Sequence, residues 1–300
     1  MPANPAQPSG RAAPPNVPAP PASDAAARPG TAPAGPSGPD SRLGIVHLYP
    51  TLMGTYGDAG NVAVLRHRAA GRGIGVEIVT VGPGDPVPAL GDLYVIGGGE
   101  DHGQVVAARL LRQSGALAAA VTRGAAVFAV CAGLQVIGTD FEVAGGAIEP
   151  GLGLLDARTR RREPRAVGEV LADPDPALGL DFLTGYENHG GGTELGDGAR
   201  PLARLRERPG GGHTGIGNGA GGPAGDGTEG AYAGHVLGTY LHGPVLARNP
   251  GLADLLLAWA AGRDLAPFAA PYVPELRAER AAYVTAGTLS PAAFDPAVPS

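Results

Sequence analysis

The chain has 300 residues, of which 43% are hydrophobic, and a formal net charge of −6. This size and composition allow one large folded domain or two smaller ones, and the mild acidic balance argues against a nucleic-acid-binding surface. All 22 basic residues are arginine, so the lysine of a phosphate-binding P-loop is missing and a nucleotide site of that class is excluded.

Cys131 is the only cysteine in the sequence. A single cysteine makes neither an intramolecular disulfide nor a Cys-x-x-Cys metal site, which fits a reducing compartment. The first residues lack the basic and apolar regions of a signal peptide, and no apolar run approaches the roughly 20 residues of a membrane span. We therefore expect a soluble cytoplasmic protein with no metal centre and no cofactor of its own.

Composition divides the chain into three parts. Residues 1–42 are dominated by Pro, Ala, Gly and Ser, and such a segment buries too little apolar surface to fold, so we expect disorder there. Residues 43–263 are predicted to form the folded domain, with a glycine-rich loop at 209–230 between strands. Residues 264–300 are predicted to be a peripheral C-terminal extension with one helical stretch near 275–283.

Strand and helix patterns alternate within the folded region. Strands are predicted at 43–50, 76–82, 92–99 and 125–130, and helices at 60–74, 103–124, 132–138 and 250–262, with one internal glycine break in the helix at 103–124. Further strands near 166–171 and 233–239 are expected to extend the same sheet. This alternation predicts an α/β fold with a doubly wound, mostly parallel sheet and helices on both faces.

Cys131 lies between the strand predicted at 125–130 and the helix predicted at 132–138. Ligands of open α/β sheets bind beyond the carboxyl ends of the strands, and a tight strand-to-helix turn exposes its central side chain there. The small residues Ala129, Ala132 and Gly133 permit such a turn. The helix N-terminus would favour a thiolate, and the Ala132 N–H would face a developing oxyanion. A buried structural cysteine is the competing interpretation, and position alone does not separate the two.

A nucleophilic thiolate usually needs a base, and the sequence offers seven histidines. His67 is predicted to face solvent from a helix, and His47 to be a core residue of a strand. His102, His189 and His242 lie beside glycines. His242, in "GTYLHGPV" (238–245), ends an apolar strand and would share the sheet edge with Cys131. His189 lies in a polar loop at 184–192 that is also able to reach Cys131.

A second glycine-rich turn follows the strand predicted at 92–99, in "VIGGGEDHG" (95–103). Its glycines allow a close backbone approach, so the N–H of Gly98 is a candidate second oxyanion donor. A glycine triplet alone is weak evidence, because it is often only a turn.

Taken together, these motifs resemble a known family. "CAGLQ" after an apolar strand, "GGG" at an earlier strand end, "ENHGG" and "GTYLHGP" resemble a class I glutamine amidotransferase domain of the CobB/CobQ-like branch. The segments 48–74, 97–104, 184–193 and 238–250 are more closely similar to the GatD-type glutaminase subunits of lipid II isoglutaminyl synthases. The resemblance covers about residues 43–262.

The resemblance implies roles for particular residues. Cys131 would attack the side-chain amide of glutamine, and His242 would act as base and then as acid toward the leaving ammonia. Four further positions match residues around the bound glutamine, with Arg165 pairing with its carboxylate: Arg165, Gln135, Asn188 and Gly190. Many class I members carry His-x-Glu, but Pro244 stands in the glutamate's place, so only a Cys–His dyad is predicted.

The resemblance also implies a reaction and a partner. Glutamine would be hydrolysed through a thioester, and the ammonia would pass to a Mur-ligase-like (MurT-type) subunit that holds ATP and Mg and amidates the D-glutamate α-carboxyl of lipid II. The predicted heterodimer would be cytoplasmic, working at the inner membrane face. Two alternatives stay open: a glutaminase for another acceptor, such as that of cobyric acid synthases, which usually carry a fused ATP-binding domain, or a non-catalytic regulatory module. The intact set of Cys131, Gln135 and His242 speaks against the second.

Overall fold

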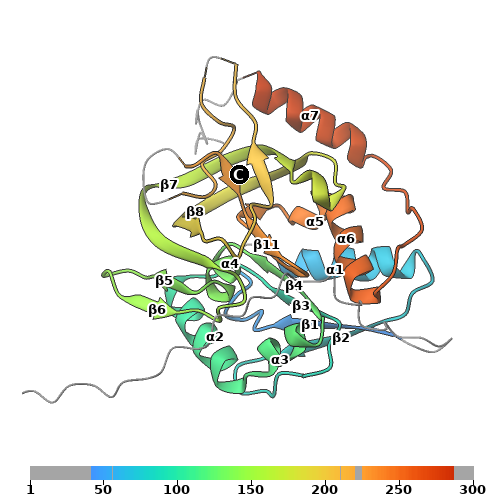
Figure 1. Ribbon diagram of the computed structural model, residues 1–300. Coiled ribbons are helices and arrows are strands. Elements are labelled where there is room, and N and C mark those ends of the chain that lie inside the picture. The colour runs from blue at the N-terminus through green and yellow to red at the C-terminus, as the bar shows by residue number, and fades with distance from the viewer. Residues whose placement is uncertain (1–41, 56, 210, 220–224, 287–300) are drawn as a thin grey trace, which may run out of the picture. The chain divides into compact units, whose positions relative to one another are not determined.

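A computed structural model describes residues 42–55, 57–209, 211–219 and 225–286 of the chain (Figure 1). The segment predicted to be disordered, 1–42, lies outside these residues except for its last position, and so does the end of the predicted C-terminal extension. Among the helices described, none has the length and apolar character needed to span a membrane.

The first sheet is the predicted parallel one. Its strand order is β11 (Ala231–Ala233), β12 (Val236–Thr239), β4 (Ala126–Val130), β3 (Leu93–Ile96), β1 (Leu43–Leu48) and β2 (Val76–Val81). All neighbours pair in parallel except β11 with β12. The central strands β3 and β4 are buried along their whole length, as expected for a parallel sheet covered on both faces. The prediction of a mostly parallel α/β sheet is confirmed.

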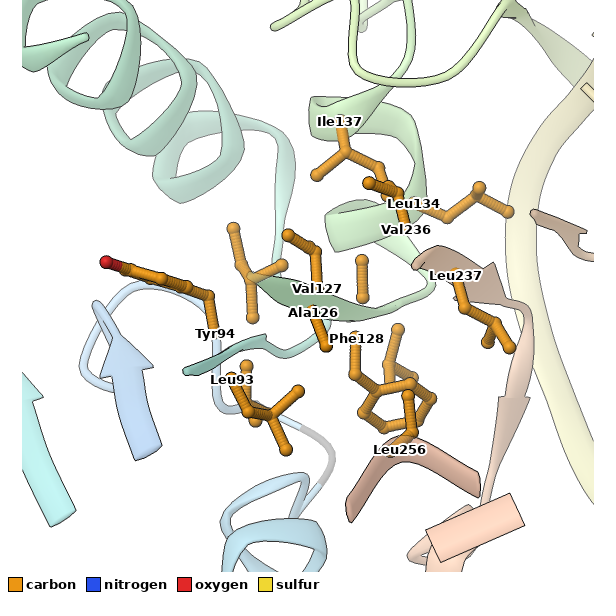
Figure 2. Close-up of a cluster of buried hydrophobic side chains, with 14 of the residues drawn as sticks. Leu93, Tyr94, Ala126, Val127, Phe128, Leu134, Ile137, Val236, Leu237 and Leu256 are labelled. Carbon is orange, nitrogen blue, oxygen red and sulfur yellow. The ribbon is translucent and has the colours of Figure 1, made fainter. Parts of the chain in front are cut away.

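Helices cover both faces of this sheet (Figure 1). One face carries α1 (Ala59–Ala70) and α6 (Pro250–Ala261), and the other carries α2 (Asp101–Ser114), α3 (Ala116–Thr122) and α4 (Ala132–Ile137). Figure 2 shows Leu134 and Ile137 of α4 on one side of β4 and Leu256 of α6 on the other. The glycine break predicted within 103–124 is confirmed, because Gly115 takes a left-handed conformation with φ 62° and ends α2.

A second, mostly antiparallel sheet was not predicted. Its main path runs β10 (Thr228–Glu229), β9 (Ala203–Leu205), β7 (Ala157–Pro174), β5 (Asp140–Glu142) and β6 (Ile148–Pro150). The strand β8 (Leu183–Leu195) pairs with β7 and with β13 (Leu241–His242). Two expectations are therefore corrected: the strand near 166–171 belongs to this second sheet, and residues 184–192 form most of a strand rather than a loop. The inward-facing side chains of β8 are largely polar, so the strand lacks an apolar period of two.

The glycine-rich segment 209–230, expected to be a loop between strands, includes β10 at its end. Among its other described residues, His213 forms an isolated bridge with Glu207. Asn218 is fully buried, and its side-chain amide donates to the Gly230 carbonyl at 2.7 Å. The Ile216 N–H of this segment donates to Oε1 of Glu187 on β8 at 2.8 Å, so the described part packs onto the domain through specific hydrogen bonds.

The helical stretch predicted near 275–283 lies in α7 (Val273–Thr285). Two shorter helical elements precede it in the chain, η1 (Pro176–Leu178) and α5 (Val245–Arg248). Arg277 of α7 is only 8% exposed and donates to the Asn249 side-chain oxygen at 2.7 Å and to the Arg248 carbonyl at 3.0 Å. Val284 is also buried. Residues 273–285 are therefore anchored on the domain by a buried guanidinium as well as by apolar contacts.

The two sheets meet where four parallel strands end together. The register pairs Leu48 with Ile96, Ile96 with Ala129, and Val130 with Thr239, so β1, β3, β4 and β12 present their carboxyl ends at one edge. Ligand sites of open α/β sheets lie at this edge. Immediately after β12 the chain enters β13 and joins the second sheet, which brings β8 to the same edge.

Candidate active site

Cys131 occupies the strand-to-helix turn that the sequence predicts. It directly follows β4, its backbone has φ 53° and ψ −110°, and its N–H donates to the Thr239 carbonyl at 2.8 Å. A positive φ at a residue other than glycine is strained and is held by the surrounding structure. A Cβ at Gly133 would lie only 2.8 Å from the Ile96 carbonyl oxygen, so the turn needs a glycine there. Cys131 is 5% exposed and lines a cavity of about 350 Å³.

His242 stands beside Cys131, and a buried carboxylate stands behind it. Its Nδ1 lies 3.5 Å from Oδ1 of Asp58, which has no exposed surface. Burial alone would lower the pKa of His242, but hydrogen bonding to Asp58 and to Cys131 raises it to about 9. The imidazole therefore carries a proton at neutral pH, which places a positive charge beside the Cys131 sulfur.

Asp58 is a residue at the site that the sequence interpretation missed. It precedes α1, within the segment 48–74 that carries part of the family resemblance, but no role was assigned to it. In the structure, Asp58 supplies the carboxylate beside His242 that the sequence pattern lacks, because Pro244 stands at the glutamate's position. Cys131, His242 and Asp58 thus form a line of three groups, with the carboxylate able to orient the imidazole as in other nucleophile–histidine–carboxylate sites.

The role predicted for Gly98 does not fit this geometry. Its N–H donates to Oδ2 of Asp58 at 2.7 Å, and its carbonyl accepts from the Thr55 N–H at 3.3 Å. The cavity is lined by Gly99 rather than Gly98. Gly98 therefore holds Asp58 and does not aim its N–H at Cys131. Ala132 does line the cavity, at the first position of α4, where a backbone N–H has no partner within the helix.

Arg165 and Asn188 act as one unit at the cavity. The Nε of Arg165 donates to Oδ1 of Asn188 at 2.6 Å, and its Nη2 donates to the Asn188 carbonyl at 3.0 Å. That carbonyl oxygen is 4.0 Å from the Cys131 sulfur. Arg165 and Gly190 line the cavity, whereas Asn188 supports the guanidinium from behind. The structure thus brings all three of these predicted binding positions to the cysteine.

Gln135 lines the cavity and is held by two other side chains. Its Nε2 donates to the Tyr240 hydroxyl at 3.2 Å, and its Oε1 accepts from Nε2 of Gln104 at 2.7 Å. Neither Gln104 nor Tyr240 was singled out in the sequence, although both lie in its motifs "GGGEDHGQ" and "GTYLHGP". Gln135 is therefore part of a buried polar network rather than an isolated contact residue.

The three candidate histidines occupy different places at the site. His242 stands at the sulfur, and His102 is an exposed residue at the cavity wall. His189 is 1% exposed, stacks on the Tyr240 ring at 3.8 Å, and has its Nδ1 2.7 Å from the Gly191 carbonyl oxygen. The predicted exposure of His67 and burial of His47 are confirmed. Only His242 has the position of a base for Cys131.

The cavity walls carry charges of both signs. Glu100 and Asp101 at the start of α2 and Glu142 of β5 supply carboxylates, whereas Arg161 and Arg165 of β7 supply guanidinium groups. Asp101 accepts from Nη1 of Arg161 at 3.1 Å. A small ligand that is itself zwitterionic, such as a free amino acid, suits these walls. Among the residues described, no group of three or more His, Cys, Asp or Glu side chains is placed to hold a metal ion.

Known proteins resemble this chain over most of its length. The family model of the CobB/CobQ-like glutamine amidotransferase domain matches residues 44–250. The chain is 32% identical to the lipid II isoglutaminyl synthase (glutamine-hydrolyzing) subunit GatD of Staphylococcus aureus, over 75% of the chain and 87% of the relative. It is 31% identical to GatD of Streptococcus pneumoniae, over 73% of the chain and 80% of the relative. A cobyric acid synthase of Sphingopyxis alaskensis is 33% identical, but the match covers only 42% of that protein. The chain belongs to the family of CobB/CobQ-like glutamine amidotransferase domains.

Proposed function

We propose that this protein is the glutaminase subunit of a lipid II isoglutaminyl synthase, and that it hydrolyses L-glutamine through a thioester on Cys131. The observation that carries the proposal is the line of Cys131, His242 and Asp58, whose cysteine lines the same cavity as Arg165 and Gln135. Each of these groups has a task in amide hydrolysis, and a nucleophile, a histidine and a carboxylate in this order support the proposal.

In the first half of the reaction the Cys131 sulfur attacks the side-chain amide carbon of glutamine. The N–H of Ala132 at the start of α4 donates to the oxyanion of the tetrahedral intermediate. The carbon–nitrogen bond then breaks, His242 gives its proton to the departing nitrogen, and ammonia leaves. The pKa of about 9 suits this step, because His242 holds a proton at neutral pH and returns to the neutral form as it gives it up.

In the second half the now neutral His242 takes a proton from a water molecule as the water attacks the thioester carbon. The carbon–sulfur bond breaks, glutamate leaves, and Cys131 returns to a thiolate beside a protonated His242. Asp58 stabilises the imidazolium in both halves without itself changing protonation.

The ammonia would pass to a separate Mur-ligase-like (MurT-type) subunit, because making an amide from a carboxylate requires an activated acyl group. That subunit would bind ATP and Mg and amidate the D-glutamate α-carboxyl of the lipid II stem peptide to D-isoglutamine. Similarity over 87% of one GatD and 80% of another supports this acceptor over a corrin carboxylate, for which the match covers 42% of the relative. The heterodimer would work in the cytoplasm, at the inner membrane face.

Reconstitution tests the acceptor. The purified chain, a co-expressed Mur-ligase-like subunit, ATP, Mg, L-glutamine and lipid II are expected to yield lipid II whose mass falls by about one unit as a hydroxyl is replaced by an amino group. Omitting the chain should stop amidation from glutamine, while added ammonium salt should restore it. Ammonia release from glutamine without amidation would contradict the lipid II assignment and leave the glutaminase standing.

Replacing Arg165 with alanine is expected to raise KM for glutamine by roughly 10- to 100-fold, because a charge-assisted hydrogen bond contributes about 1.5–3 kcal/mol. The turnover at saturating glutamine and the alkylation of Cys131 should change little. Arg158→Ala is the matched control, because Arg158 lies on the same strand and pairs with Asp140 at 3.6 Å outside the cavity. Equal effects of the two substitutions on KM would remove Arg165 from the glutamine site.

A further inference from the structure

Gln104 has one polar atom that the protein does not use. Its side chain comes from the first turn of α2, is 3% exposed and lines the cavity. Its Nε2 donates to Oε1 of Gln135 at 2.7 Å. Its own carbonyl oxygen makes no hydrogen bond with any described residue and is not among the buried atoms cut off from solvent. That oxygen is therefore available to a ligand as a hydrogen-bond acceptor.

The orientation of the Gln104 amide is set from behind by a chain of buried hydroxyl groups. Gln135 donates to the Tyr240 hydroxyl at 3.2 Å, which lies 2.6 Å from the hydroxyl of Thr193, which in turn lies 2.8 Å from that of Thr159. Burial raises the pKa of Tyr240 to about 12, so its hydroxyl keeps its proton. Gln135 directs its NH₂ group to Tyr240 and its carbonyl to Gln104, and Gln104 turns its NH₂ group to Gln135.

The backbone around this chain of hydrogen bonds leaves room for it. A Cβ added at Gly191 would lie 2.4 Å from Nε2 of Gln135 and 3.2 Å from the Tyr240 hydroxyl oxygen. A side chain at Gly191 would therefore displace the Gln135 amide. The last glycine of the "ENHGG" motif is therefore needed for the position of Gln135 and, through the hydrogen bond between them, of Gln104.

Carboxylates lie near Gln104 in the cavity wall. Glu100 and Asp101 lie at the start of α2 and Glu142 lines the cavity from β5, with Asp101 paired to Arg161 at 3.1 Å. Carboxylates at a wall attract a positively charged group. Arg165 supplies the positive counterpart for a carboxylate from β7. An α-amino acid carries its ammonium and its carboxylate on one carbon atom. Its ammonium can therefore face Gln104 while its carboxylate faces Arg165.

We propose that the Gln104 carbonyl oxygen accepts a hydrogen bond from the α-ammonium of the bound glutamine, in an orientation fixed by Gln135 and Tyr240. Gln104 is then a specificity-determining residue, and Tyr240 a positioning residue that acts through it. This inference rests on the proposed glutaminase function, because it identifies one contact of that function's substrate.

The test compares two substrates in the complex with the Mur-ligase-like subunit. Values of kcat/KM for ammonia release are measured with L-glutamine and with 4-carbamoylbutanoate, which is glutamine without its α-ammonium. Gln104→Met keeps an unbranched side chain of similar length but no acceptor. Because a hydrogen bond to a charged group is lost, the preference for glutamine is expected to fall roughly 10- to 100-fold. Gln113→Met, an exposed position on the same helix, is the matched control and should leave the preference unchanged.

Two more variants separate recognition from a structural role. Gln104→Glu retains an acceptor and is expected to retain the preference for glutamine. Tyr240→Phe keeps the buried ring but removes the hydroxyl, and is expected to reduce the preference several-fold. The alkylation rate of Cys131, the only cysteine, reports in each variant whether the site is still formed.

The outcomes distinguish failure of the Gln104 contact from failure of the proposed glutaminase function. An unchanged preference in Gln104→Met, or an equal loss with both substrates, would overturn the contact to the α-ammonium. An equal loss of preference in Gln104→Glu and Gln104→Met would overturn the acceptor role. Wild-type complex that releases no ammonia from glutamine would instead contradict the proposed function itself.

Discussion

Replacing Cys131 with alanine is expected to reduce ammonia release from glutamine by roughly 10⁴- to 10⁶-fold, the usual effect of removing a catalytic nucleophile. The thioester requires the sulfur, and no other cysteine is present to replace it. Cys131→Ser should be nearly as inactive, for a different reason. A serine hydroxyl is not ionised at neutral pH and is a far weaker nucleophile than a thiolate.

The measurement is steady-state ammonia release by wild type, Cys131→Ala and Cys131→Ser, each with the partner subunit. Unfolding curves should show that all three fold, since alanine and serine fit the small buried volume at the turn. Mass spectrometry of wild type quenched during turnover should find a γ-glutamyl adduct on Cys131. Wild-type rates in Cys131→Ala would refute the thioester mechanism, and the partner subunit assayed alone controls for contaminating glutaminase.

The parts of the site that the sequence predicts correctly are those formed by neighbours in the chain. Cys131 lies between an apolar strand and a short helix, and the small residues that the turn requires are within three positions of it. Gln135 follows on the same helix. Local patterns of this kind carry their own geometry, because a strand end and a helix start fix where the residue between them points.

The second sheet could not be predicted in this way. The strand β8 buries Glu187 and His189 on its inner side, and these polar groups conceal the alternation that marks a strand. Their burial is satisfied by partners far away in the sequence: Glu187 accepts from the backbone N–H groups of Ile216 and Gly217 at 2.8 Å and 3.0 Å. A strand stabilised by such contacts can be recognised only once the fold is known.

Asp58 escaped the sequence interpretation for a related reason. The motif that usually orients the histidine places a glutamate two residues after it, and Pro244 occupies that position. The carboxylate comes instead from the loop after β1, more than 180 residues earlier in the chain, and reaches His242 because β1 and β12 end at the same edge. The position of Asp58 also explains why the oxyanion role predicted for Gly98 does not fit. The Gly98 N–H donates to the Asp58 carboxylate instead.

Asp58→Asn is expected to lower kcat by about 10²- to 10⁴-fold while the protein stays folded. An amide can still accept from Gly98, but it has no negative charge to stabilise the imidazolium of His242. Asp92→Asn is the matched control. Asp92 also accepts a backbone N–H, from Gly44 at 2.7 Å, but it precedes β3 at the opposite edge of the sheet. It should leave kcat unchanged.

The pH dependence separates an orienting charge from a merely structural aspartate. The pKa of His242 is raised from 6.5 to about 9 in the folded protein, so its contribution to stability is fully present below pH 6.5 and is lost as the pH rises through 9. Wild type should therefore lose both unfolding free energy and kcat/KM toward pH 9. In Asp58→Asn this loss should begin at a lower pH, because the Asp58 carboxylate is one of the two groups, with Cys131, that raise the pKa of His242. His47 also faces Asp58, but burial lowers its pKa, so it is neutral across this range and does not contribute to the change. An alkaline limb that stays near pH 9 in Asp58→Asn, with kcat intact, would mean that another group orients His242.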